Sequence, residues 1–352
     1  MADFVAQAGP LRGLVEDELA KLFTPEGLLT DAEVPPGLAE PMRYALLGGG
    51  KRLRPVLCLA ACQAVCGDPA PALPAALAIE VLHNYTLVHD DLPCMDDDTL
   101  RRGRPTVHAK YGYGQAVLVG DALQAAAFQL ALTPPKSHAE STEFVSHAES
   151  AENAESGSPA GGSAERSEAE GVIRHSAFGI QHSLCMALAR AAGPAGVVGG
   201  QWVDVTSSPP HDEARVSYVH AHKTGDLIAC ACEMGAIAAG AASEEGSGGS
   251  SPRSLAREFG RALGLAFQIV DDLLDAEDPA KASELSILRV CTPEEARARA
   301  RAATERALRA LDALAAIPAG RAGSPDGRAP SRPHAALALL RSLAEDQLSR
   351  TL

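Results

Sequence analysis

Two clusters of aspartate are the residues of this 352-residue chain best suited to chemistry. The stretch HDDLPCMDDDTLRRG at 89–103 holds five aspartates within nine residues, and two arginines follow. The stretch AFQIVDDLLDAED carries a polar stripe along one face of a helix whose other faces are apolar. That stripe consists of Gln268, Asp271, Asp272 and Asp275. Carboxylates in apolar surroundings are unfavourable without a cation, and oxygen ligands suit magnesium. Together the clusters predict a magnesium-bridged clamp for a diphosphate.

The first cluster needs a break in its helix before its aspartates can act together. Asp90 and Asp91 end a helix that Pro93 cannot continue, because the proline ring clashes with the carbonyl of His89. On an ideal helix Asp96 would point away from Asp90, but a break at LPCM brings it back to share metals. The alternative interpretation is an acidic cap region that leads into a loop.

Basic residues recur in three short segments. They are Lys51, Arg52 and Arg54 in GGGKRLRP, Arg101, Arg102 and Arg104 in LRRGRP, and Lys223 beside Thr224 in AHKTG. Each alone is more typical of a surface charge than of an anion ligand. Together they predict two kinds of anion site, one bridged by metal at the aspartates and one formed directly by cationic side chains.

Composition limits the partners and the fold class. A net charge of −14 argues against nucleic acid, whose phosphates need a basic face. Alanine and leucine dominate and aromatics are 4%, which favours helices. No apolar run is expected to reach the roughly 18 residues of a membrane span. The eight cysteines show no CxxC spacing, which suits a reducing compartment. Cys58, Cys62 and Cys66 recur at helical spacing and are interpreted as buried core residues rather than as a zinc site.

The chain is predicted to be all-α, a single domain over residues 1–352 with one insertion. Helices are expected at about 11–23, 36–47, 55–65, 75–91, 114–132, from near 173, and at 212–241, 251–275, 292–315 and 334–349. Residues 133–171, rich in Ser, Ala, Glu and Gly, are interpreted as a disordered surface insertion without chemistry. A second flexible stretch is expected at GSGGSSP.

The motifs GGGKRLRP, LVHDDLPCMDDDTLRRGRPT, GGQWVD, HKTG and FQIVDDLLD, in this order, resemble those of the trans-isoprenyl diphosphate synthases. The similarity is to the short-chain farnesyl and geranylgeranyl diphosphate synthases of the bacterial and plant type. It covers about 10–132 and 172–278. Class I terpene cyclases, a third interpretation, share an aspartate-rich motif but lack the second DDxxD and GGKRLRP. The resemblance implies an all-α bundle with a deep central cavity, usually a homodimer.

The resemblance also assigns roles to individual residues. It implies that both aspartate motifs bind Mg²⁺, for which Mn²⁺ can substitute, through Asp90, Asp91, Asp96, Asp271, Asp272 and Asp275. It implies that the allylic diphosphate is held by Arg101, Lys223, Thr224 and Gln268. It implies that isopentenyl diphosphate is held by Lys51, Arg54, His83 and Arg102. Apart from the resemblance, a core histidine is the preferred interpretation of His83.

The implied reaction is a prenyl transfer of isoprenoid biosynthesis. Magnesium and cationic side chains stabilise the departing diphosphate, and the double bond of isopentenyl diphosphate attacks the allylic cation head to tail. Tyr85 and Thr86, just before the first motif, are predicted to limit product length. An aromatic residue at Tyr85 favours farnesyl diphosphate, whereas the overall similarity keeps geranylgeranyl diphosphate open.

One segment departs from the family pattern. In the family a Gly/Lys-rich segment follows the second motif, whereas here Asp275 leads into AEDPAKASELSILRV, with Lys281 as the nearest lysine. The alternative function is therefore a weak or inactive regulatory subunit that pairs with an active prenyl synthase. The intact first motif favours the enzyme. No transit peptide is apparent after Met1, and the expected location is the cytoplasm or a plastid.

Overall fold

The structure is a computed structural model that describes residues 2–30, 34–135, 163–208, 210, 212–241, 251–277, 285–317 and 334–350. Most of the predicted insertion at 133–171 lies outside these residues, as does Lys281. The end of that insertion is described, and it is helical: α8 begins at Ser163 rather than near residue 173.

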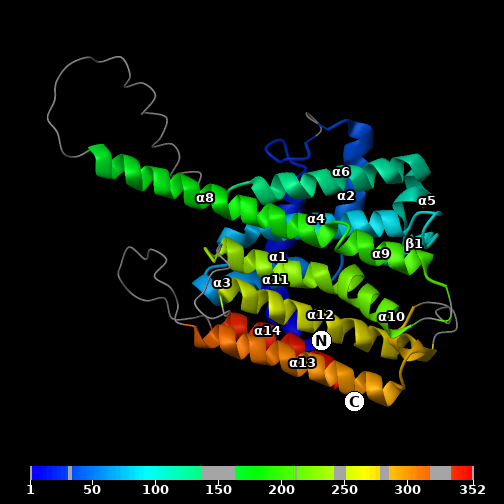
Figure 1. Ribbon diagram of the computed structural model, residues 1–352. Coiled ribbons are helices and arrows are strands. Elements are labelled where there is room, and N and C mark those ends of the chain that lie inside the picture. The colour runs from blue at the N-terminus through cyan, green and yellow to red at the C-terminus, as the bar shows by residue number, and fades with distance from the viewer. Residues whose placement is uncertain are drawn as a thin grey trace.

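The described chain is a bundle of helices, as predicted for an all-α protein (Figure 1). Its α-helices are α1 (Ala2–Lys21), α2 (Pro36–Leu46), α3 (Leu53–Cys66), α4 (Leu73–Asp90), α5 (Val107–Tyr111), α6 (Tyr113–Leu132), α8 (Ser163–Ala192), α9 (Val197–Thr206), α10 (Glu213–Val219), α11 (Asp226–Ala238), α12 (Pro252–Leu274), α13 (Pro293–Ala316) and α14 (His334–Ser349). Short 3-10 helices lie at Ala70–Ala72, Asp275–Glu277 and Ile287–Arg289. The terminal helices α1 and α14 pack against each other.

The centre of the bundle is formed by α3, α4 and α11, which are apolar on nearly every face. Helix α11 packs closely on α3: a Cβ added at Gly235 would meet the carbonyl oxygen of Cys58 at 2.1 Å. Helix α12 is amphipathic and lies between α11 and α13 (Figure 1). Cys58 and Cys62 of α3 are buried there, in line with the core interpretation, whereas Cys66 is half-buried.

The expectation that no apolar segment is long enough to span a membrane was wrong for helix α6. Its 20 residues, Tyr113–Leu132, are long and apolar enough to cross a membrane by length and composition alone. However, α6 packs along α4 and also contacts α8, and 44% of its apolar window is buried in the bundle. The packing is that of a core helix, so no membrane span is inferred from it.

A small β-hairpin follows α4 and was missed by the sequence analysis. Strands β1 (Leu100–Arg101) and β2 (Arg104–Pro105) pair antiparallel across a turn formed by Arg102 and Gly103. Both turn residues have positive φ, 54° and 74°, as a two-residue primed turn requires. Two-residue strands leave no alternating pattern in a sequence. The hairpin nevertheless presents the arginines of LRRGRP.

The predicted helix at 212–241 is divided in the structure. Between α10 and α11 the chain forms a π-helix at His220–Gly225, with the sequence HAHKTG. This segment, called the π segment below, contacts α9, α10, α11 and α12. A widened turn of this kind is rare in helices and frequent at functional sites. Here it carries the Lys and Thr of the HKTG motif.

Candidate active site

The first aspartate motif turns back on itself at the end of α4. The backbone N–H of Asp96 donates to the carbonyl of Asp90 at 2.9 Å, and that of Asp97 donates to Leu92 at 3.1 Å. Asp97 adopts a left-handed conformation with φ 55°, which an aspartate tolerates better than most residues. The break at LPCM therefore returns Asp96 to Asp90, as the sequence predicted.

Carboxylates of the first motif gather around one lysine. The pKa of Asp90 is raised to about 6, chiefly by burial, with the charges of Asp96 and Asp91 adding to the rise and the charge of Lys223 opposing it. Burial also raises the pKa of Asp96. The Lys223 ammonium lies 2.5 Å from Asp204, at the end of GGQWVD. The local negative charge exceeds what this lysine balances, so the group suits an added cation.

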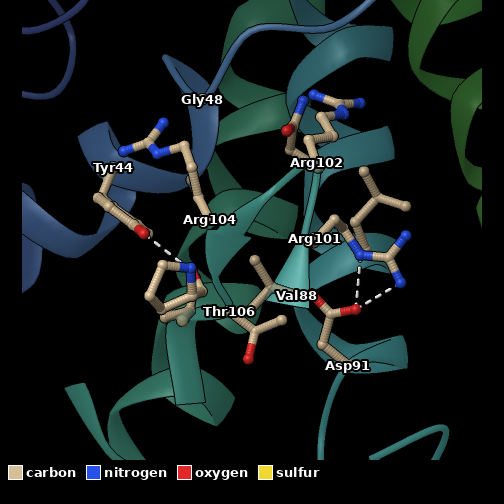
Figure 2. A pocket seen from close by; sticks show the side chains of 13 residues that line it. Tyr44, Gly48, Val88, Asp91, Arg101, Arg102, Arg104 and Thr106 are labelled. Atoms are coloured by element: carbon tan, nitrogen blue, oxygen red, sulfur yellow. Dashed lines mark hydrogen bonds and ion pairs between the residues drawn. The ribbon is translucent and has the colours of Figure 1, made fainter. Parts of the chain in front are cut away.

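Asp91 is paired with the hairpin. It is 4% exposed, and Arg101 donates to its Oδ1 through Nε at 2.6 Å and Nη2 at 2.5 Å (Figure 2). The second partner of Arg101 is the exposed Asp98, at 3.2 Å. The pair fixes β1 to the end of α4, so it locates the other arginines of the hairpin relative to the aspartates.

A hollow of about 440 Å³ lies between α2, the end of α4 and the hairpin. It is lined by Tyr44, Ala45, Gly48, Asn84, Leu87, Val88, Asp91, Arg101, Arg102, Arg104, Pro105, Thr106 and Val107 (Figure 2). The Tyr44 hydroxyl donates to the carbonyl of Pro105 at 2.8 Å, and the Arg104 guanidinium lies 4.1 Å from the Tyr44 ring centroid. Arg102 donates to the carbonyl of Gly49. Three arginines in one hollow favour an anionic ligand.

The basic residues of GGGKRLRP divide between the site and the core. Arg52 is 2% exposed and is bound to Glu16, to Glu80 at 2.7 Å and to the carbonyl of Leu46 at 2.7 Å. Its cationic group is fully used inside the protein, so the interpretation of Arg52 as part of an anion site was wrong.

Arg54, His83 and Arg102 come close together, whereas Lys51 lies apart. Arg54 is 3.1 Å from His83 Nε2, and burial lowers the pKa of Arg54 to about 10. Burial and the charge of Arg54 lower the pKa of His83, with Arg102 contributing, so the imidazole is neutral. Lys51 lines a different hollow, of about 520 Å³, with Arg12 and Phe267.

The second aspartate motif is on the last turns of α12. Asp271 and Asp272 differ in environment: the Asp271 side chain is 38% exposed and lies 3.4 Å from Arg350, whereas Asp272 is buried among protein donors. Burial raises the pKa of Asp271, against the charges of Arg350 and Lys51. Asp275 follows at the end of the helix.

The π segment links the two motifs. Lys223 faces Asp90 and Asp96, while the hydroxyl of its neighbour Thr224 donates to Gln268 Oε1 at 2.7 Å. Gln268 lies on the polar stripe of α12, one turn before Asp271. Of the side chains predicted for the allylic side, Arg101 and Lys223 therefore lie at the first motif, and Thr224 and Gln268 are bonded to each other beside the second. The sequence analysis did not identify Asp204, which binds Lys223, or His220, which begins the π segment and lies 3.1 Å from Asp272.

Tyr85 and Thr86 lie one turn before the first motif and are buried, 7% and 8% exposed. The Tyr85 ring meets His89 edge to face at 5.4 Å between centroids. The Thr86 hydroxyl donates to the carbonyl of His83 at 2.8 Å. His89 in turn packs against Gly120 of α6, where an added Cβ would lie 2.0 Å from its ring. Tyr85 is therefore buried about one turn from Asp90, with its ring against His89.

The donors fit a magnesium ion that is completed by its substrate. Among the described residues, no three carboxylate, imidazole or thiol groups converge closely enough to hold an ion alone. Magnesium is typically bound by one or two carboxylates together with substrate phosphates and water. Asp90 and Asp96 supply such a pair, and the excess negative charge there favours a cation.

Comparison with known proteins identifies the family. The family model described as polyprenyl synthetase matches residues 35–155 and 181–284. The chain belongs to the polyprenyl synthetase family. Geranylgeranyl pyrophosphate synthase 11, chloroplastic, from Arabidopsis thaliana is 40% identical over 248 residues, 69% of this chain and 57% of that protein. The large subunit 1 of a heterodimeric geranylgeranyl pyrophosphate synthase from the same plant is also 40% identical, over 69% of this chain and 55% of that protein.

Similar solved structures support the same family assignment. An FPP/GFPP synthase from Zymomonas mobilis is 31% identical with a TM-score of 0.69, and 98% of each chain is covered. A geranyltransferase from Helicobacter pylori, complexed with magnesium and isoprenyl diphosphate, is 27% identical with a TM-score of 0.66, again over 98% of each chain. The polyprenyl synthetase family member described here spans somewhat more than half the length of the curated plant relatives it matches.

Proposed function

We propose that this chain catalyses the magnesium-dependent, head-to-tail condensation of isopentenyl diphosphate with an allylic diphosphate. One observation carries the proposal: the π segment joins the two aspartate motifs. Lys223 faces Asp90 and Asp96, and the adjacent Thr224 is bonded to Gln268 on the stripe that carries Asp271. A diphosphate placed between the motifs would meet carboxylates for metal ions and a lysine for direct contact. The named relatives act in the same chemistry, which supports this assignment.

The allylic diphosphate is assigned to Arg101, Lys223, Thr224 and Gln268, next to Asp90, Asp91, Asp96, Asp271, Asp272 and Asp275. Magnesium, when bound, supplies a Lewis acid that neutralises charge on the departing diphosphate, and manganese can replace it. Lys223 and Arg101 add fixed positive charge where the C–O bond breaks. The buried surroundings of Tyr85 keep water from the allylic cation, which it would otherwise quench.

Isopentenyl diphosphate is assigned to Arg54, His83 and Arg102, and also to Lys51, which lines the other hollow with Arg12 and Phe267. Arg102 lies in the arginine-lined hollow, and Arg54 with the neutral His83 supplies further donors. The C–O bond of the allylic diphosphate breaks first and leaves an allylic cation. The double bond held there attacks this cation to form the C–C bond, and a proton then leaves to the released diphosphate. We propose farnesyl diphosphate as the main product, because the aromatic ring of Tyr85 stands behind the first motif. Geranylgeranyl diphosphate is the alternative, which the plant relatives favour.

The assembly and its location follow as proposals of the same kind. We propose a single-domain chain that works as a homodimer, with pairing to another prenyl synthase subunit as the second possibility. The name of the heterodimeric Arabidopsis relative supports that second possibility. The plant relatives named here are chloroplastic, which favours a plastid over the cytoplasm.

A regulatory subunit remains the second candidate function, since the Gly/Lys-rich segment expected after Asp275 is missing from the sequence. One assay decides between them. The purified chain is incubated with magnesium, radiolabelled isopentenyl diphosphate and each allylic primer, and products are sized by chromatography. Labelled product that disappears with chelator supports the enzyme. No product with any primer refutes it, and stimulation of an active synthase by the inert chain supports the regulatory function.

A further inference from the structure

We infer that Asp272 is a positioning residue that fastens the π segment to α12, and that it is not a metal ligand. The inference rests on the proposed function, which otherwise assigns all three aspartates of the second motif to metal. It follows from three features: the donors that surround Asp272, the packing of the π segment, and the contrast with the adjacent Asp271.

Both carboxylate oxygens of Asp272 are already bound by protein groups. Oδ1 accepts from Gln268 Nε2 at 3.0 Å, and Oδ2 accepts from the backbone N–H of Ile287 at 2.6 Å. His220 Nε2 lies 3.1 Å from the same Oδ2. Asp272 is 8% exposed.

The partners of Asp272 belong to two separate parts of the chain. His220 begins the π segment, and Ile287 opens the 3-10 helix Ile287–Arg289, which follows the second motif. Ile287 is 3% exposed and packs in a small core with Val216 and Val270. Its N–H is thus buried and needs an acceptor. Because the Ile287 N–H and His220 both contact Oδ2, a metal ion at that oxygen would have to displace one of them.

The π segment is packed closely between α9 and α12, so a single side-chain contact can fix its position. An added Cβ at Gly200 of α9 would lie 2.3 Å from the backbone N of Lys223, and one at Gly264 of α12 would lie 2.9 Å from Cα of Gly225. Asp272 reaches this segment twice, directly at His220 and through Gln268 to Thr224. It thereby helps to set where the Lys223 ammonium lies.

Asp271 provides the matched comparison. It is adjacent on the same helix, its side chain is 38% exposed against 7% for that of Asp272, and Arg350 lies 3.4 Å from it. An aspartate that faces outward can bind an incoming cation without breaking buried hydrogen bonds. The metal-binding part of the second motif is therefore assigned to Asp271 and Asp275, in keeping with the few protein ligands that magnesium takes.

The test compares Asp272→Ala with Asp271→Ala in the full chain. Two quantities are measured: the melting temperature without divalent cation, and the rise in melting temperature when magnesium and inorganic diphosphate are added. Asp272→Ala is expected to lower the melting temperature without cation by about 3 °C or more, because buried donors lose their acceptor. The increase on adding magnesium and diphosphate should stay as large as in the wild type. Asp271→Ala is expected to change the melting temperature without cation by about 1 °C at most. It should lose most of the increase that magnesium and diphosphate produce.

Asp272→Asn replaces Asp272→Ala if the alanine variant does not fold, and His220→Gln serves as an independent variant. His220→Gln is expected to raise KM for the allylic diphosphate several-fold while the magnesium concentration for half activity stays unchanged. The inference is overturned if Asp272 variants lose the rise, or if their melting temperature without cation equals that of the wild type. If magnesium and diphosphate do not raise the melting temperature of the wild type, the proposed function fails. The melting temperatures without cation still test whether Asp272 holds the π segment in place.

Discussion

The ion pair between Asp91 and Arg101 gives the sharpest prediction about how the site is built. Arg101→Met removes the guanidinium while keeping most of the side-chain stem. Asp91 then loses two short charge-assisted hydrogen bonds and remains 4% exposed. Breaking a fully buried pair costs about 3–5 kcal/mol, and the 32% exposure of the Arg101 side chain reduces this to about 2–3 kcal/mol.

That loss is measurable as a change in melting temperature. Unfolding entropy is about 2.1 cal/mol/K per residue, or about 0.7 kcal/mol/K for 352 residues. A destabilisation of about 2–3 kcal/mol therefore lowers the melting temperature by about 3–4 °C. The double variant Arg101→Met with Asp91→Asn should recover much of the loss, because no buried charge is left unpaired.

Asp98→Asn is the matched control, since it removes the exposed partner of the same arginine and should cost under about 0.5 kcal/mol. The reasoning fails if Arg101→Met changes the free energy of unfolding no more than Asp98→Asn does. It also fails if the effects of Arg101→Met and Asp91→Asn simply add.

The other predictions concern turnover, product length and the core. Asp90→Asn should lower turnover about a hundredfold, whereas Asp97→Asn, outside the DDxxxxD spacing, should have little effect; steady-state kinetics test both. Tyr85→Ala should shift the product from farnesyl toward longer diphosphates in chromatography. An unchanged product distribution would show that Tyr85 does not limit product length. Arg52→Met should destabilise the fold by about 3–5 kcal/mol in denaturant unfolding, because Glu80 is left buried and unpaired. A loss below about 1 kcal/mol would show that Arg52 is not a core cation.

Helices and motifs were predictable from the sequence because their signals are local. Helices α2, α6, α13 and α14 match their predicted ranges to within a residue or two, since apolar periodicity and caps such as the Thr292–Glu295 capping box mark them. The return of Asp96 to Asp90 was predictable from Pro93 for the same reason.

Features that depend on tertiary contacts were not predictable from the sequence. The hairpin strands are two residues long, and the π segment reads as ordinary helix until its neighbours are known. The burial of Arg52 depends on Glu16 and Glu80 from other helices, and neither is near it in sequence. Likewise, the difference between Asp271 and Asp272 arises from His220 and Ile287, which the DDxxD spacing cannot reveal.

The most direct test of the central claim is the binding of an uncleavable allylic thiodiphosphate, measured by calorimetry with and without magnesium. The two aspartate motifs are proposed to hold the diphosphate through metal ions, so affinity should fall at least about tenfold in excess chelator, a loss of about 1.4 kcal/mol. Asp90→Asn should show a similar loss even with magnesium present. Equal affinity of the wild type with magnesium and with chelator would contradict the account.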